Sequence, residues 1–421
     1  MSARELDSAG QPGGRRPHGA GIENGTRLPA ETARSPVDRM RQLAQERFAP
    51  RAADYDQAAA FPRENFDDLF EADLLAPCLP TAAGGLNLGH AYGDVMTLWN
   101  MTKEVAKADL SMARCWEGHV NSLMLLDGMA DAAQKERWFP GVVQDGQIWV
   151  AWSGEPQSPA PGETVRFGTN IESVDGGYIV NGTKVFATSS GGANWAILLV
   201  STAGPGAARH ATGSPDQLIM LACDLSDPTV SFDGSWWDPI GMRSTVSYLV
   251  KFQNTFIPAE NLIGRPGQYF EDGWQTCFIP HYAVSFLGAA EAAYEHALEY
   301  IAGQHKASDP YVQQHLGQMA MNVETGQLWI EHVARMWDTG EHEQARLAGS
   351  RARHMIEHLA QDTVNRCIRA CGARCLNRPS PVERICRDLT IYLRHDNDDH
   401  ILATIGKAVL GQSHDASFYK P

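Results

Sequence analysis

The most constraining feature of the sequence is a change of periodicity that happens twice. Residues 36–146 carry apolar residues at helical spacing, residues 147–260 break into short β-rich runs between turn residues, and residues 261–421 return to helical spacing. We therefore expect a mainly α fold with a central β-domain: an N-terminal helical domain, a β-barrel-like middle domain and a C-terminal four-helix bundle. Residues 1–35 are rich in Gly, Pro and Arg, and we expect a disordered tail there.

Composition excludes several classes of partner. The 421 residues carry a formal charge of −15, which argues against binding to nucleic acid or to an anionic membrane surface. No apolar run approaches the ~18 residues that a membrane-spanning helix needs, and the N-terminal segment lacks the apolar core of a secretory signal. Eight cysteines spread over a long chain fit a reducing cytoplasm. Cys367, Cys371 and Cys375 share one helical face, and we expect buried thiols there and no metal site.

The stretch GGYIVNGTKVFATSSGGANWAILLV, residues 176–200, resembles a strand, a turn, a second strand, a polar break and a third strand. Asn181-Gly182 is the signature of a tight hairpin turn, because both turn positions need a positive φ. After Phe186 come hydroxyl side chains and then glycines. Two interpretations are open on local grounds: the break is an ordinary turn, or something flat packs against it.

Four segments together resemble the acyl-CoA dehydrogenase superfamily of flavoenzymes, and the resemblance covers roughly residues 38 to 411. The segments, in chain order, are IWVAWSGEP (148–156), the stretch 176–200, WWDPIGMRSTVSYLVKFQNTFIPAENLIG (236–264) and CGARCLNRPSPVERICRD (371–388). The resemblance implies that the flat object is a flavin ring. It implies FAD as the cofactor, with FMN as a possible alternative.

The resemblance also assigns residues to flavin binding. In the family an aromatic-x-Thr triplet lies against the ring, a second strand approaches from beside it, and a double glycine lies near the diphosphate or adenine. The matching residues here are Trp152 and Ser153, Phe186, Ala187 and Thr188, and Gly372 with Ala373. An aromatic face suits ring stacking, and hydroxyl and backbone groups suit the polar edge of the ring.

The sequence departs from the family where the substrate should be handled. Counted from Arg387-Asp388, the family's catalytic Glu position holds Asp396, preceded by His395. The Arg that helps clamp a thioester substrate is replaced by Ile279. The flavin-binding motifs therefore match well, whereas the motifs that handle acyl-CoA match poorly.

Two reactions remain as hypotheses. In the first, Asp396 removes the α-proton of an acyl thioester, flavin takes the β-hydride, and an electron-transfer flavoprotein accepts the electrons. In the second, the chain resembles the superfamily's monooxygenases, which carry a similar His-Asp pair and use reduced flavin from a separate flavin reductase; His395 would then manage a proton. By composition alone, HDNDDH also predicts a solvated acidic helix face. A flavin binder without catalysis is the third hypothesis, and a homo-oligomer, a tetramer or dimer, is expected in each case.

Overall fold

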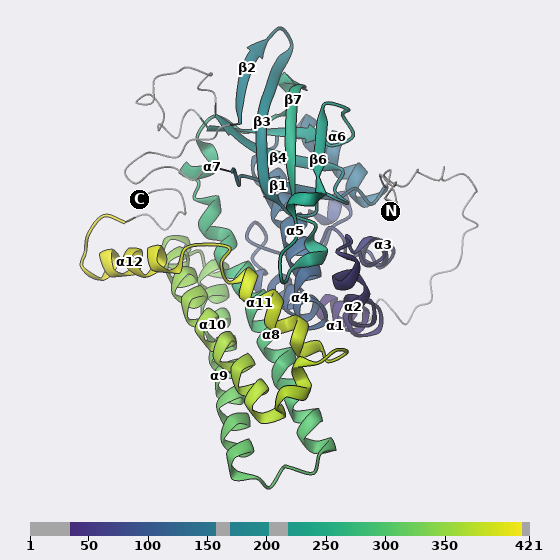
Figure 1. The fold of residues 1–421 in the computed structure, drawn as a ribbon. Coiled ribbons are helices and arrows are strands. Elements are labelled where there is room, and N and C mark those ends of the chain that lie inside the picture. Colours follow the sequence, from purple (N-terminus) through teal and green to yellow (C-terminus); the bar gives the residue numbers. More distant parts are fainter. Residues whose placement is uncertain (1–33, 157–168, 202–217, 415–421) are drawn as a thin grey trace, which may run out of the picture. The chain divides into compact units, whose positions relative to one another are not determined.

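The computed structural model describes residues 34–156, 169–201 and 218–414. The tail expected at residues 1–35 therefore lies almost wholly outside the described residues. The described chain begins with helices, as the periodicity predicts (Figure 1). Their bounds are α1 (Pro36–Leu43), a π-helical turn (Ala44–Phe48), α2 (Ala49–Ala58), α3 (Arg63–Glu71), α4 (Val95–Ala108), α5 (Leu110–Met129) and α6 (Ala132–Val143).

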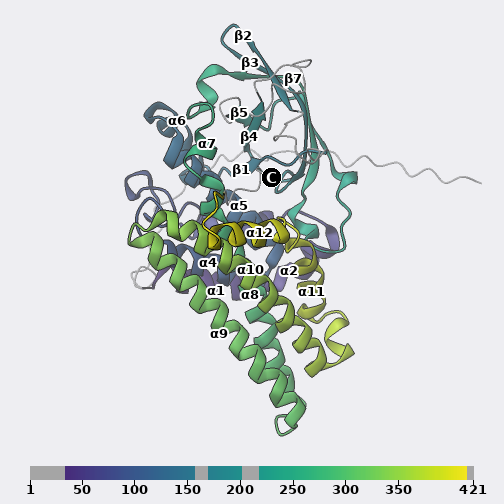
Figure 2. The same cartoon turned by 90° about the vertical axis from the view of Figure 1, so that its left-hand side faces the viewer.

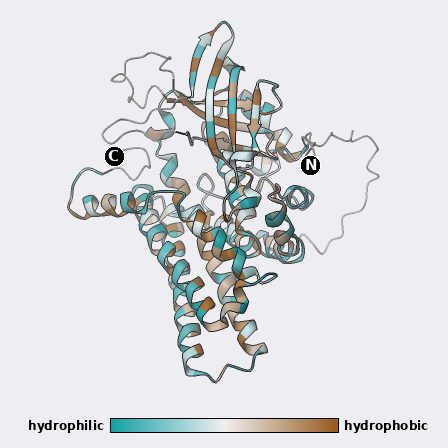
Figure 3. Cartoon of the chain, in the orientation of Figure 1, coloured by the Kyte–Doolittle hydropathy of each residue, from teal (hydrophilic) through white to brown (hydrophobic). Residues whose placement is uncertain are grey.

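The middle of the chain forms one sheet of eight strands. Their order is β6-β7-β3-β2-β4-β5-β8, with β1 paired in parallel to β4, so β6 and β8 form the ends of the sheet within the described residues. The strands are β1 (Trp149–Trp152), β2 (Asn170–Val174), β3 (Gly177–Ala187), β4 (Trp195–Ser201), β5 (Leu218–Asp224), β6 (Val230–Asp233), β7 (Tyr248–Pro258) and β8 (Leu262–Ile263). Hydrophobic and hydrophilic residues alternate along β7, as expected of a strand that buries one face (Figure 3), whereas β4 and β5 are apolar and buried over most of their length.

The hairpin turn expected at Asn181-Gly182 is wrong. β3 runs straight through these residues, and β2 pairs with β3 from Val174↔Gly177 to Asn170↔Asn181, so the hairpin closes at residues 175–176 instead. The Asn181 side chain exchanges hydrogen bonds with Asn254 of β7, beside an irregularity in the β3–β7 register. A Cβ on Gly182 would lie 2.5 Å from Thr169 Cα, so the glycine permits a close strand contact rather than a turn.

The last third of the described chain is helical again. Its helices are α7 (Gln268–Glu271), α8 (Trp274–Gly303), α9 (Pro310–Asp338), α10 (His342–Cys371), α11 (Pro381–Tyr392) and α12 (Asp398–Val409). The long helices α8, α9 and α10 lie side by side in both cartoon views (Figures 1 and 2). The predicted fold, helices on both sides of a central β-domain in sequence, is confirmed.

One hydrophobic core joins the N-terminal helices to the C-terminal ones, and a second lies within the sheet. Small residues of α8 bring α4 close: a Cβ on Gly288 would lie 2.7 Å from both Ala106 Cβ and Lys103 O. Close packing of α4 and α8 in turn fixes α5 and α11, which carry the buried polar groups of the site. Among the described helices, none is both long enough and apolar enough to cross a membrane.

Candidate functional site

The end of β1 meets the end of β3, and this contact brings together five of the seven residues assigned to flavin binding. Trp152 Nε1 donates to the carbonyl oxygen of Thr188 at 3.1 Å. Val185 N donates to Gly154 O at 3.0 Å, and a Cβ on Gly154 would lie 2.6 Å from Val185 O. Ser153 therefore lies next to the turn that begins at Phe186, as the resemblance implies.

Phe186 is held in an unusual position for an aromatic residue. Its φ is 49°, in the left-handed region, and 63% of its surface is exposed. Its ring meets Trp236 edge to face, with centroids 4.9 Å apart, and Trp237 at 6.0 Å. Backbone strain and an exposed aromatic both cost free energy, and such features concentrate at binding sites. The exposed ring suits one face of a planar ligand.

The hydroxyl of Thr188 is oriented by residues that follow the Gly-Met-Arg-Ser segment. Thr188 Oγ1 lies 3.1 Å from Ser247 Oγ, which lies 2.7 Å from Thr245 Oγ1. Ser189 N donates to Thr245 O at 2.8 Å. Ser244 Oγ is buried with no hydrogen-bond partner among the described residues. An exposed aromatic ring, an oriented hydroxyl and an unsatisfied hydroxyl nearby fit the flat polar-edged ring system of a flavin.

The Arg-Asp pair of α11 anchors this same segment. Met242 N donates to Asp388 Oδ1 at 2.5 Å, and Arg387 Nη1 donates to Ile240 O at 2.9 Å. Burial and the nearby carboxylate of Asp109 raise the pKa of Asp388 to about 7. α11 therefore positions the loop that in turn orients Thr188.

The Glu-Pro dipeptide that ends the first motif also has a structural role. The Lys184 ammonium is fully buried and donates to Glu155 Oε1 and to Leu199 O, each at 2.7 Å. Burial lowers the pKa of Lys184 to about 8. Glu155 thus connects the segment after β1 to Lys184 of β3, two residues before Phe186.

Gly372 and Ala373 are not brought to this place. Gly372 ends α10 with a φ of 77°, and no heavy atom of the described chain lies within 4 Å of where its Cβ would be. That end of α10 lies at the far end of the helical domain from the sheet (Figures 1 and 2). One described chain therefore does not place these two residues next to Phe186.

His395 and Asp396 lie in the turn between α11 and α12. The Asp396 side chain is fully buried, so the solvated acidic helix face that HDNDDH allowed is wrong for that residue, whereas His395 is exposed. Asn397 caps α12 instead, accepting hydrogen bonds from the backbone of Asp399 and His400, and the charges that face solvent begin in the first turn of that helix.

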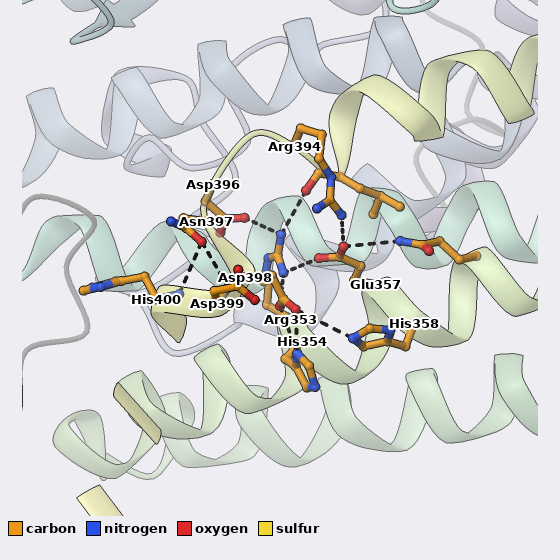
Figure 4. Close-up of polar contacts among 12 residues, drawn as sticks. Arg353, His354, Glu357, His358, Arg394, Asp396, Asn397, Asp398, Asp399 and His400 are labelled. Carbon is orange, nitrogen blue, oxygen red and sulfur yellow. Dashed lines mark hydrogen bonds and ion pairs between the residues drawn. The ribbon is translucent and has the colours of Figure 1, made fainter. Parts of the chain in front are cut away.

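Both oxygens of the Asp396 carboxylate have partners. Oδ1 accepts from Arg353 and Oδ2 accepts from the Tyr282 hydroxyl (Figure 4). The side chains of Asp396 and Arg353 are fully buried. Burial raises the pKa of Asp396, while the Arg353 guanidinium and the Tyr282 hydrogen bond oppose that rise. The carboxylate at the family's Glu position is therefore part of a buried ion pair.

Arg353 is the centre of a larger charge cluster. Besides Asp396 it pairs with Glu357, one turn along α10, and with Asp398 Oδ1 at 2.6 Å (Figure 4). Arg394 pairs with Glu357 as well. The sequence analysis missed Arg353. An Arg and a Glu at i, i+4 in a helix form a common surface pattern, so this spacing alone does not predict a buried pair.

His395 is flanked by aromatic rings and by two cations. Its ring lies between Tyr282 and Tyr392, with centroid distances of 5.1 and 5.9 Å. Desolvation of the ring and the cations Arg114 and Arg353 hold the pKa of His395 well below its usual value. A neutral imidazole has one nitrogen that donates and one that accepts, so it can hold or release a proton without a lasting charge.

A buried hydrogen-bond chain continues from Tyr392 through α5 and α8. The Tyr392 hydroxyl donates to Glu117, which also accepts from Asn121 and pairs with Arg114. The chain extends through His281 to Thr102 and Trp116. This network was missed too. Its signal is present in the sequence, because Arg114, Glu117 and Asn121 form a polar stripe on an otherwise apolar helix.

Comparison with known families agrees with the fold. The family models "Acyl-CoA dehydrogenase, N-terminal domain" and "Acyl-CoA dehydrogenase, C-terminal domain" match residues 30–145 and 281–398, which together span more than half of the chain.

Individual relatives come from two kinds of enzyme. A dibenzothiophene monooxygenase of Mycolicibacterium goodii is 24% identical, covering 90% of this chain and 94% of that protein. A cyclohex-1-ene-1-carbonyl-CoA dehydrogenase of Geobacter metallireducens is also 24% identical, covering 89% and 97%. The crystal structure of FMN-bound TdsC from Paenibacillus sp. A11-2 superposes with a TM-score of 0.80 at 22% identity, covering 91% of this chain and all of that one.

The matched families and the fold agree with one another. The chain belongs to the acyl-CoA dehydrogenase superfamily and is a flavin-dependent oxidoreductase.

Proposed function

We propose that the protein is a flavin-dependent monooxygenase of the two-component type, which receives reduced FMN from a separate flavin reductase and transfers one oxygen atom to a small organic substrate. The observation that carries the proposal is the state of the Asp396 carboxylate. A base for an α-proton must present a free oxygen to the substrate, but both oxygens of Asp396 are engaged, by Arg353 and by Tyr282.

Two further observations support this choice over thioester oxidation. Ile279 is fully buried in α8 and stands where the family has an Arg for the thioester. His395 lies between two tyrosines and its pKa is lowered from the usual value, which suits a group that manages one proton. Bound reduced flavin would supply the two electrons that activate dioxygen.

Each residue of the site then has a proposed role. Phe186 contacts one face of the ring, and Thr188 and the Trp152–Ser153 segment offer hydrogen bonds to its polar edge. His395 holds a proton on one ring nitrogen and hydrogen-bonds through the other. Asp396 keeps Arg353 neutralised and so keeps the turn that carries His395 in place.

FMN is proposed over the FAD of the first expectation for two reasons. The structural relative TdsC is described with FMN. Gly372 and Ala373, the residues expected near the adenine half of FAD, lie on exposed backbone at the far end of α10. For a two-component enzyme, the partner is a flavin reductase, and we propose the cytoplasm as its compartment.

We also propose a homo-oligomer. Met321 and Leu328 lie seven residues apart on α9, and 61% and 58% of their respective surfaces are exposed. Apolar residues exposed on one helix face suit a contact between copies of the chain. Light scattering during size-exclusion chromatography measures the assembly directly.

Acyl-CoA oxidation is the second candidate. The observation in its favour is a carboxyl group at the family's Glu position whose pKa is raised, as a catalytic base requires. In that reaction Asp396 would have to leave Arg353 to reach the substrate, and an electron-transfer flavoprotein would accept the electrons.

The test gives the protein the conditions for each of the two reactions in parallel. The protein is incubated with FMN, NADH, a flavin reductase and oxygen in the presence of dibenzothiophene or indole, and products are searched by mass spectrometry for one added oxygen atom. In parallel, it is loaded with FAD and given short-chain acyl-CoAs under anaerobic conditions. Oxygenated product without loss of flavin absorbance under acyl-CoA supports the proposal. Rapid loss of flavin absorbance under acyl-CoA, without oxygenated product, supports the second candidate.

A further inference from the structure

Two histidines and a carboxylate meet on the outer side of the Arg353 cluster. His354 and His358 lie four residues apart on α10 and therefore face the same way, with ring centroids 4.5 Å apart. Asp398, the first residue of α12, faces both rings (Figure 4). The ligand atoms of these three residues all lie within 4.8 Å of one another.

The two oxygens of Asp398 face different groups. Oδ1 pairs with Arg353 at 2.6 Å and lies 2.9 Å from His354 Nδ1. Oδ2 lies 3.1 Å from His354 Nδ1 and 3.7 Å from His358 Nε2. Arg353 therefore leaves the second oxygen directed at two imidazole nitrogens.

These separations match those of ligands around one tetrahedral ion. Zn²⁺ binds imidazole nitrogen and carboxylate oxygen at about 2.0–2.2 Å, so two ligand atoms of a tetrahedral site lie about 3.4 Å apart. The two distances from Oδ2, 3.1 and 3.7 Å, lie on either side of that value. His358 is the most exposed of the three, with 57% of its side chain accessible, so water can complete the coordination.

The charge of the surroundings also favours a cation. The cluster around Arg353 holds three carboxylates, those of Glu357, Asp396 and Asp398, against the two guanidinium groups of Arg353 and Arg394. One negative charge thus remains in a partly buried place. Two imidazoles beside it provide nitrogen ligands, which select ions such as Zn²⁺ over Mg²⁺ or Ca²⁺.

We propose that His354, His358 and Asp398 form a binding site for a divalent transition-metal ion, of which Zn²⁺ is the best match. The ion would join α10 to the first turn of α12. Because Asp398 and Asp396 share Arg353, the ion would also restrain the turn that carries His395. The three proposed ligands are none of the residues assigned to flavin binding or to proton transfer.

Zinc binding by the full-length chain tests the proposal, measured by calorimetry after treatment with a chelator. We expect one equivalent of Zn²⁺ to bind the wild type and to raise its midpoint of thermal unfolding, while Mg²⁺ does neither. Removing a group that only supports a metal ligand typically costs 10–100-fold in affinity, so His358→Ala, which removes a ligand, should weaken binding at least about 10-fold. His332→Ala, on the neighbouring helix α9, serves as the matched control and should bind as the wild type does.

His358 is exposed enough that its loss should leave the protein folded, and far-ultraviolet circular dichroism checks this. Asp398→Asn, which keeps the shape of the side chain, should weaken Zn²⁺ binding as well. The proposal is overturned if Zn²⁺ does not bind the wild type, or if it binds His358→Ala as tightly as the wild type. The second result would place the ion elsewhere, for example on the thiols of Cys367, Cys371 and Cys375.

Discussion

The two places at which the sequence matches the family's functional motifs differ in how their polar and aromatic groups are used. At the end of the sheet, Phe186 is exposed and strained, and Thr188 is held by a chain of hydroxyls. In the turn between α11 and α12, the carboxylate of Asp396 is buried and both its oxygens have partners. The first place, which we call the open region, exposes groups that a ligand can contact. In the second, which we call the closed region, the polar groups pair with one another.

The difference shows that a position matching the family can have its polar atoms paired within the chain. Asp396 occupies the family's Glu position, but Arg353 and Tyr282 occupy its lone pairs. The same Arg353 draws in Glu357 and Asp398, so the whole turn is fixed by charge pairing. A carboxylate engaged in this way joins the turn to α8 and α10.

The largest expected effect is on the free energy of unfolding, after a substitution in the closed region. Arg353→Met leaves three carboxylates without their central partner and should lower the free energy of unfolding by about 3–5 kcal/mol. Arg351→Met on the same helix is the control, because Arg351 has no ion pair among the described residues, and should change little. Urea titration measures both. Equal stability of the two variants would mean that the buried cluster is not what holds the turn.

The next effect concerns Asp388, which links the helical domain to the loop behind Thr188. Its pKa in the folded protein is about 7, above the usual value of about 4, so between these pH values the folded state keeps a proton that the unfolded state has lost. Stability therefore falls as pH rises through this range. Asp388→Asn removes that loss, and its stability relative to wild type should grow from pH 4 to pH 7 by up to about 4 kcal/mol.

Urea titrations at a series of pH values measure this prediction. Above pH 7 the difference between Asp388→Asn and wild type should become constant. A difference that does not change with pH would show that Asp388 is ionised in the folded protein over the whole range.

A smaller effect is expected in the open region. Phe186→Ala combined with Thr188→Ala removes the exposed ring and the oriented hydroxyl, which together contribute roughly 1–3 kcal/mol, or about 10- to 100-fold in flavin affinity. Phe256→Ala is the control, because Phe256 is a comparably exposed aromatic on β7 of the same sheet. Fluorescence titration with flavin measures all three proteins. If the double variant binds as the wild type does, the flavin does not lie against Phe186.

The residues of the open region lie close together in the sequence, and those of the closed region do not. Phe186 and Thr188 belong to one short segment, and the Trp152 side chain reaches it by a hydrogen bond to Thr188 O. The partners of Asp396 come from α8 and α10, and each lies more than forty residues away in the sequence. No local pattern therefore links them to Asp396. The turn prediction at Asn181-Gly182 was wrong because the same residues also suit an irregular strand pairing. There the missing side chain of the glycine leaves room for Thr169. Fold class depended only on the order of helical and β-rich segments, so it could be predicted in full.

The most direct test of the central claim is the form of flavin that the protein takes up. The protein is purified, its absorbance is recorded, and it is titrated anaerobically with reduced FMN, oxidised FMN and FAD. Our account predicts a colourless preparation that binds reduced FMN more tightly than either of the others, because the electrons arrive with the flavin and Asp396 takes no part in extracting them. A yellow preparation with tightly bound FAD, which loses its colour on addition of an acyl-CoA and keeps it in Asp396→Asn, would contradict the account.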